Sequence, residues 1–157
     1  GAAPKYVHGE VGGNFRLDSL QAALLRDKLP LLDRYHAARR EHAEAYLSEL
    51  AGVDGIALPT VSRDAESVWN QFTIRVLDDR REDLRAFLLE RGVGTEIYYP
   101  YSLHEQECFA GIGRGGGALP NAPRIAREVL SLPCFPELKE EERSEVVEAV
   151  TSFFRKG

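Results

Sequence analysis

The segment VWNQFTIRVL, residues 68–77, constrains the fold more than any other because apolar and polar side chains alternate along it. Its apolar face is formed by Val68, Phe72, Ile74 and Val76. A period of two is typical of a β-strand that lays one face on a hydrophobic core. Asn70 interrupts this apolar face, and a buried amide at that position requires hydrogen-bond partners.

Two helices are predicted ahead of this strand. Asp18, followed by Gln21, resembles a capping box, so the first helix is expected to begin at Ser19. Its apolar face is formed by Leu20, Ala23 and Leu24. Apolar residues at helical spacing predict a long amphipathic second helix over residues 31–50. Pro30 either kinks the first helix or lies in the first turn of the second.

A helix and a second strand are predicted after residue 77. Asp78 or Asp79 is expected to cap the helix, and Gly92 is placed to end it. The segment VGTEIYY, residues 93–99, has the pattern of a strand, which Pro100 stops.

Two more helices complete the prediction. Asn121 is expected to begin a helix that continues through Leu130 and ends before Pro133. The last helix is expected from about Glu140 to Phe154. This order of elements predicts an α+β fold, in which long N-terminal helices precede a small, mostly antiparallel sheet packed against helices.

Composition excludes several classes of function. The chain has 157 residues, the length of one domain, and a formal net charge of −5 with dispersed basic residues, so neither a nucleic-acid surface nor a membrane surface is expected. No apolar run approaches the roughly 20 residues of a membrane-spanning helix, and no secretory signal opens the chain. Cys108 and Cys134 form no metal-ligand spacing, so we expect two free thiols in a reducing cytoplasm and no metal site.

The sequence contains no motif of a self-contained active site. There is no G-x-S-x-G, no H-E-x-x-H and no glycine fingerprint of a dinucleotide-binding turn. The segment GIGRGGG, residues 111–117, lacks the Lys-Ser/Thr pair of a phosphate-binding loop and is predicted to be a mobile loop. The residues alone therefore indicate an α+β domain without an assigned chemistry.

Four motifs in order along the chain add a resemblance. They are GGNFRLDSLQAALL (12–25), VWNQFTIRV (68–76), GVGTEIYYPYSLHEQECFAG (92–111) and LPNAPRIAREVLSLPCFPEL (119–138). Together they resemble the C-terminal part of the pyridoxal-phosphate-dependent nucleotide-sugar aminotransferases of the DegT/DnrJ/StrS type, which have fold type I. The resemblance implies that residues 1–30 are a remnant of the large cofactor domain and that residues 31–157 are a linker helix and the small C-terminal domain.

The resemblance implies a cofactor-binding role for Asn14 and Arg16. In that family an Asn in a G-x-N-x-R loop reaches the cofactor phosphate in the neighbouring subunit's active site. Asn14 matches that Asn, and Arg16 matches the basic residue two positions later. Amide and guanidinium N–H groups both donate to phosphate oxygens. Without the resemblance, Asn14 is interpreted as a turn residue and Arg16 as a surface charge.

The resemblance implies a substrate-binding role for Tyr98, Tyr99 and His104, which match the wall of the family's sugar-nucleotide pocket. Phenol and imidazole rings offer a sugar both a ring face and a hydrogen-bonding edge. The alternative places one tyrosine in the core and lets His104 cap a short helix. Ser102 stands where relatives commonly have proline, so a less rigid loop is expected. Asn70 either borders the site or is satisfied by backbone groups.

The lysine that aminotransfer requires is missing from this chain. A lysine amine must hold pyridoxal phosphate covalently, and an acid must face its pyridine nitrogen. The family places both upstream of the GGNFR motif, and none of the four lysines here has the family's Ser-x-x-Lys context. We therefore expect an incomplete C-terminal portion with no catalytic residue and no transaminase activity of its own.

The parent enzyme implied by the resemblance transfers an amino group from glutamate to a keto-sugar nucleotide, in amino-sugar biosynthesis for cell-surface polysaccharides. It is expected to be a cytoplasmic homodimer whose sites draw on both subunits. The apolar face of the first helix is then expected to stay buried through self-association. Two alternatives remain: a non-catalytic interaction domain with the same fold, and a related sugar dehydratase in which histidine replaces the lysine.

Overall fold

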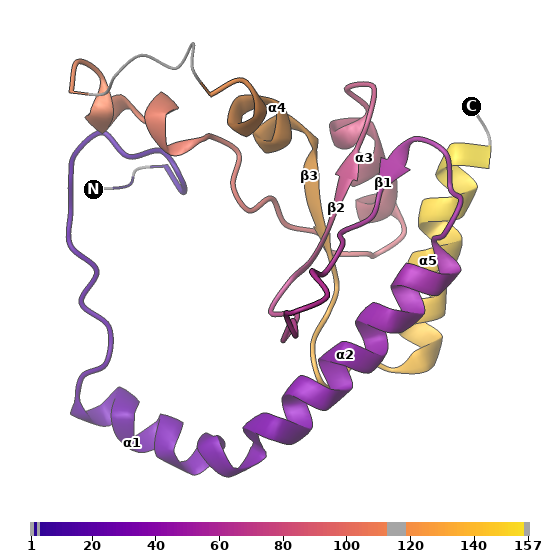
Figure 1. Ribbon diagram of the computed structural model, residues 1–157, viewed down its shortest axis with the longest axis horizontal. Coiled ribbons are helices and arrows are strands. Elements are labelled where there is room, and N and C mark those ends of the chain that lie inside the picture. The colour runs from indigo at the N-terminus through magenta and orange to yellow at the C-terminus, as the bar shows by residue number, and fades with distance from the viewer. Residues whose placement is uncertain (1, 3, 113–118, 156–157) are drawn as a thin grey trace. The chain divides into compact units, whose positions relative to one another are not determined.

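A three-stranded antiparallel sheet, ordered β1–β2–β3, organises the α+β fold that the sequence predicts (Figure 1). This computed structural model describes residues 2, 4–112 and 119–155. The strands are β1 (Ile56–Ala57), β2 (Phe72–Val76) and β3 (Val129–Leu132). Of the predicted mobile loop 111–117, residues 113–117 lie outside the described residues.

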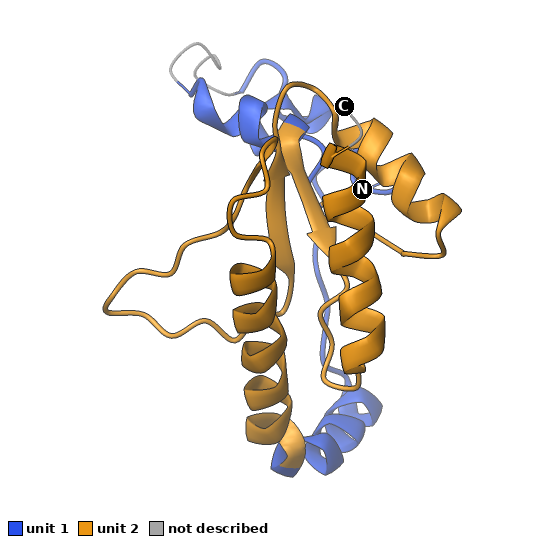
Figure 2. Cartoon of the chain, turned by 90° about the vertical axis from the view of Figure 1, so that its right-hand side faces the viewer, with its two compact units in different colours: residues 1–30, 98–127 blue, residues 31–97, 128–157 orange. Residues whose placement is uncertain are grey.

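Contacts between residues divide the chain into two units, which Figure 2 colours separately. Unit 1 comprises residues 1–30 and 98–127, and unit 2 comprises residues 31–97 and 128–157. The grouping of 98–127 with the N-terminal residues was not expected from the sequence. The assignment of residues 1–30 to a large cofactor domain stays a prediction.

Unit 2 contains the sheet and a core to which three helices contribute. These helices are α2 (Leu32–Glu49), α3 (Arg81–Glu90) and α5 (Glu140–Arg155). Helix α5 packs against both α2 and α3. The fully buried apolar side chains of the core are Ala43, Tyr46, Phe72, Ile74, Val76, Leu84, Leu88, Leu130 and Val150. The predicted final helix is confirmed, and Val146 and Val150 are buried on it.

The alternation that predicted a strand is confirmed over residues 72–76. Phe72, Ile74 and Val76 are buried, whereas the two residues between them are half-buried. The strand is shorter than the pattern suggested, because residues 68–71 form an irregular approach to β2. Asn70 therefore lies outside the strand and is exposed, so its side chain does not interrupt a buried face.

The two N-terminal helices are confirmed. Helix α1 (Ser19–Lys28) begins where predicted, because the Asp18 carboxylate accepts a hydrogen bond of 2.8 Å from the Gln21 N–H. Pro30 lies in a short 3₁₀ turn, η1 (Leu29–Leu31), directly ahead of α2. No residue of α1, all of which are described, is buried, so its leucines are exposed within this chain.

The predicted cap of α3 is wrong. Asp78 and Asp79 adopt φ angles of 57° and 56°, in the left-handed region, where they turn the chain after β2. A residue that caps a helix through its side chain typically has an extended backbone instead. The cap position is therefore Arg80, which makes no side-chain capping bond.

Two predictions failed around β3. Residues 93–99 form no regular strand; only Glu96 pairs with Ser131, through N–H···O bonds of 2.8 and 3.2 Å. Helix α4 (Asn121–Glu128) is shorter than predicted, because residues 129–132 form β3. All four residues of β3 are buried, the polar Ser131 included, and a short run buried on both faces has no periodicity that distinguishes strand from helix.

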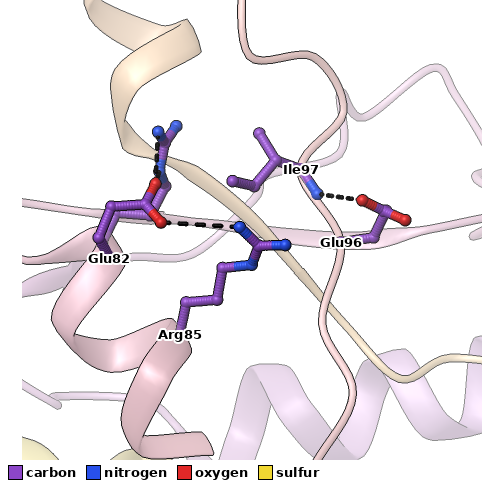
Figure 3. A network of polar contacts seen from close by, with 5 residues as sticks. Glu82, Arg85, Glu96 and Ile97 are labelled. Atoms are coloured by element: carbon purple, nitrogen blue, oxygen red, sulfur yellow. Dashed lines mark hydrogen bonds and ion pairs between the residues drawn. The ribbon is translucent and has the colours of Figure 1, made fainter. Parts of the chain in front are cut away.

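Charged contacts on the surface of α3 contribute little to this fold. Figure 3 shows Glu82 and Arg85 on α3, with Arg85 Nη1 3.7 Å from Glu82 Oε2. Both side chains are largely exposed, and such pairs contribute about 1 kcal/mol or less. The same view shows the Glu96 carboxylate accepting a 3.4 Å bond from the Ile97 N–H, just before the chain enters unit 1. Burial of the core is therefore the main stabilising contribution in unit 2.

Gly92 provides a test of how α3 ends. Its φ of 75° allows its own N–H and that of Val93 to bond to the carbonyls of Leu89 and Leu88. Gly92→Ala is expected to lower the free energy of unfolding by roughly 1–2 kcal/mol, because a side chain disfavours the left-handed region. Urea denaturation measures the change.

The matched control is Gly94→Ala, at a position where an added Cβ meets nothing within 4 Å and no positive φ is required. Its free energy of unfolding is expected to stay within about 0.5 kcal/mol of the original. Equal losses in the two variants would contradict the assigned role of Gly92.

Candidate functional site

Asn14 and Arg16 lie in an irregular segment directly before α1, and both are exposed. The segment joins a firmly capped helix, since Gln21 Oε1 also accepts a 2.7 Å bond from the Leu17 N–H. In the described part of the chain, no hydrogen bond or ion pair holds either side chain. Their N–H groups are therefore available to an anion, which fits the binding of a phosphate.

Tyr98 and Tyr99 are the first two residues of the segment 98–127 of unit 1, and the ring of Tyr6 contacts both of them. The Tyr6 ring centroid is 6.2 Å from that of Tyr98 and 5.4 Å from that of Tyr99. Tyr98 and Tyr99 are 6.0 Å apart. Interplanar angles of 74–83° make all three contacts edge-to-face, the geometry that aromatic pairs prefer. We call Tyr6, Tyr98 and Tyr99 the tyrosine cluster.

Neither tyrosine of the predicted pair is in the core. Tyr98 is half-buried, and Tyr99 is 60% exposed. Sequence reasoning missed Tyr6. The only signal for it was an aromatic residue in an otherwise polar, glycine-containing entry segment.

His104 is half-buried in the 3₁₀ turn η2 (Leu103–Glu105). Ser102 closes this turn: its N–H and hydroxyl both donate to the Glu105 carboxylate, and its carbonyl accepts the Glu105 N–H. The Ser102 hydroxyl is the main reason that the pKa of Glu105 is lowered. The position at which a less rigid loop was expected therefore has its own hydrogen bonds.

Gln106 is a second residue that the sequence reasoning missed. It is 8% exposed, and both ends of its amide bond to backbone groups of the N-terminal segment. This segment carries Tyr6, so Gln106 links the tyrosine cluster to the turn of His104. Among described residues, no bond or ring contact joins Asn14 or Arg16 to this cluster.

Arg39 explains the environment of Asn70. Its guanidinium donates to the carbonyls of Trp69, Asn70 and Cys134, at 3.2 Å for Trp69 and 3.1 Å for Asn70. Burial raises the pKa of the Cys134 thiol, so the thiol stays neutral beside this cation. The backbone of Asn70 thus serves a structural network in unit 2.

Other kinds of site are not found in the residues that the structure describes. They include no group of three or more side chains that could hold a metal ion, and no helix long and apolar enough to cross a membrane. Cys108 and Cys134 are free thiols. A shallow cleft of about 500 Å³ between the end of α3 and α5 is lined by Arg91, Val93 and Glu145 among others, and by none of the predicted site residues.

Comparisons with known proteins give the chain its relatives. The model of the DegT/DnrJ/EryC1/StrS aminotransferase family matches residues 1–151. The chain is 46% identical over 157 residues to a pleiotropic regulatory protein of Geobacillus stearothermophilus. It is 43% identical over 150 residues to dTDP-3-amino-3,4,6-trideoxy-α-D-glucose transaminase of Streptomyces venezuelae. The alignments cover 99% and 96% of this chain but only 42% and 39% of those proteins, so the chain spans about two fifths of the curated relatives it matches.

Solved structures show the same fold. The chain resembles S. venezuelae DesV in complex with a ketimine intermediate, with 41% identity and a TM-score of 0.83 over 98% of this chain and 41% of that one. An aminotransferase from Brucella abortus gives 30% identity and a TM-score of 0.79 over 98% and 40%. NtdA from Bacillus subtilis with bound PMP has 28% sequence identity and a TM-score of 0.72. The match covers 89% of this chain and 33% of that one.

The hydrogen bond between Ser102 and Glu105 predicts that the stability of this turn depends on pH. Because the folded pKa of Glu105 is depressed, the turn is stabilised above the ordinary pKa and loses this stabilisation as pH falls through the lowered value. Ser102→Ala removes the main cause, so the pKa is expected to rise towards its ordinary 4.5. An NMR titration of the Glu105 side chain measures it.

Ser152→Ala is the control, since its hydroxyl donates to Ala149 within α5. It should leave the Glu105 titration unchanged. A Glu105 pKa that does not rise in Ser102→Ala would contradict the assigned role of the serine.

Proposed function

Because the chain belongs to the DegT/DnrJ/EryC1/StrS aminotransferase family, we propose that it is the C-terminal part of a pyridoxal-phosphate-dependent sugar aminotransferase. The reaction proposed moves an amino group from glutamate to a keto-sugar nucleotide in amino-sugar biosynthesis. The observation that carries the proposal is the match over residues 1–151 together with the similarity to a dTDP-amino-sugar transaminase. No activity is proposed for the chain alone.

Asn14 and Arg16 are the residues of this chain proposed to hold the cofactor. Their exposed N–H groups have no partner in the described residues, and they stand just ahead of a capped helix. The amide donates to one phosphate oxygen, and the guanidinium can donate to two in parallel. When bound, pyridoxal phosphate supplies the electron sink that aminotransfer needs.

Tyr98, Tyr99 and His104 are proposed to face the sugar. The exposure of Tyr99 and the half-burial of Tyr98 and His104 leave parts of these rings accessible to a ligand. Their ring faces can pack on the C–H groups of a sugar, while the phenol and imidazole groups exchange hydrogen bonds with its hydroxyls. These residues orient the substrate, and the covalent chemistry is left to groups outside the chain.

We propose that the protein is a homodimer with composite sites. Asn14 and Arg16 make no contact with the tyrosine cluster in the described residues, as expected if the two groups serve different copies of the site. The exposed leucines of α1, Leu20, Leu24 and Leu25, offer an apolar surface for a partner or for the rest of the polypeptide. The lysine that holds the cofactor then lies outside this chain.

A second candidate function is a regulatory, non-catalytic role. It is favoured by one observation, the 46% identity to a relative named a pleiotropic regulatory protein. In that role this chain keeps the fold of the family and takes no part in aminotransfer. A sugar dehydratase would likewise bind the cofactor and a nucleotide sugar, but would not take an amino group from glutamate.

The experiment that tests the proposal follows the cofactor by absorbance in the full-length protein. Glutamate is expected to remove the visible band of bound pyridoxal phosphate, and a keto-sugar nucleotide is expected to restore it. The 157-residue chain alone should show neither change, nor any lysine labelled by borohydride. Bound cofactor that glutamate does not convert would exclude the aminotransferase and leave the regulatory or dehydratase role.

The same preparation tests the role of Arg16. Arg16→Ala is expected to raise the Kd for pyridoxal phosphate by roughly 10- to 150-fold, because a hydrogen bond to a charged group contributes about 1.5–3 kcal/mol. Arg26→Ala, on the exposed surface of α1, is the matched control and should leave the Kd unchanged. If the two variants bind the cofactor equally well, Arg16 is a surface charge.

A further inference from the structure

Gln106 is a buried polar side chain in a part of unit 1 where most residues are exposed or half-buried. A buried amide has two donors and one acceptor to satisfy. Its Nε2 donates to the Tyr6 carbonyl at 2.9 Å, and its Oε1 accepts from the His8 N–H at 2.9 Å. One side chain thus bonds to a backbone carbonyl and a backbone N–H of a segment that lies 98–100 residues away in sequence.

A backbone contact reinforces this link. The Cys108 N–H donates to the His8 carbonyl at 3.0 Å, so His8 bonds to the same loop through both its N–H and its C=O. Residues 4–7 also form a turn, in which the Val7 N–H donates to the Pro4 carbonyl at 3.0 Å. The N-terminal segment is therefore fixed to the loop that carries His104.

The consequence is the position of the Tyr6 ring. Tyr6 adopts a φ of 67°, which is uncommon for a residue with a side chain, and the bond from Gln106 to its carbonyl holds the backbone at this point. The ring then meets Tyr98 and Tyr99 edge to face. Gln106 itself lies two residues after His104, so one amide connects both parts of the proposed sugar site.

We propose that Tyr6 is a third sugar-binding side chain, completing the site of Tyr98, Tyr99 and His104, and that Gln106 is the positioning residue that holds it there. The proposal rests on the proposed function and deepens it. The ligand is the hexose of a nucleotide sugar, since ring faces and phenol groups suit C–H surfaces and hydroxyls. Gln106 does not touch the ligand and acts through the backbone of Tyr6.

The test measures binding of dTDP-glucose and UDP-glucose to the full-length protein by titration calorimetry. Tyr6→Ala is expected to raise the Kd of the nucleotide sugar that binds by about tenfold, whereas Tyr6→Phe, which keeps the ring, is expected to stay within about threefold. Gln106→Ala should raise the Kd in the same direction. The double variant Tyr6→Ala/Gln106→Ala should have nearly the same Kd as Tyr6→Ala, because the two changes remove the same contact.

Tyr101→Ala is the matched control, a half-exposed tyrosine of the same loop outside the tyrosine cluster, and should keep the original Kd. Thermal unfolding separates a folding defect from a local one. NMR contacts between the Tyr6 and Tyr98 rings should disappear in Gln106→Ala and persist in Tyr101→Ala.

The conversion of the cofactor by glutamate reports on the proposed function separately. Conversion with unchanged sugar binding in Tyr6→Ala would overturn the inference and leave the aminotransferase standing. Sugar binding that depends on Tyr6 without conversion would support the inference and exclude aminotransfer. Failure of the wild-type protein to bind either nucleotide sugar would overturn the inference.

Discussion

The antiparallel pairing of β3 with β2 is the constraint on which the remaining structure depends. It sets Phe72 opposite Leu132 and Ile74 opposite Leu130, so both strands place apolar side chains in one core. On the other edge of β3, Ser131 exchanges two hydrogen bonds with Glu96. The chain therefore leaves unit 2 after residue 97 and enters it again at residue 128, and the bridge between Glu96 and Ser131 joins the two ends within unit 2.

The proposed sugar-site residues lie on residues 98–127 and on the N-terminal segment, and polar contacts hold these two segments together more than apolar burial does. Gln106 and the backbone of Cys108 fix the N-terminal segment, while Ser102 and Glu105 close the turn of His104. Each of these bonds depends on a specific donor or acceptor, so single substitutions should alter ligand binding without unfolding the core of unit 2. Apolar burial thus stabilises the core of unit 2, whereas specific hydrogen bonds hold the segments of the proposed sugar site.

Much of the fold could be predicted because its helices and β2 show clear periodicity. Asp18 and Gln21 located the start of α1, and the alternation around Ile74 located β2. The strand at 129–132 could not be predicted, because a run buried on both faces has no period. Tyr6 and Gln106 could not be joined either, since their contact spans 100 residues and leaves no local pattern. Asn14, Arg16, Tyr98, Tyr99 and His104 came from resemblance, and their roles remain predictions.

The central claim is that this chain supplies phosphate-binding and sugar-binding groups to a composite site whose lysine lies outside it. The most direct measurement pairs two inactive forms of the full-length protein: one with Asn14→Ala and Arg16→Ala, the other lacking the cofactor-linking lysine. In purified mixed dimers the account predicts about half of the wild-type activity, because one of the two symmetric sites is then complete. Mixed dimers as inactive as their parents would contradict it.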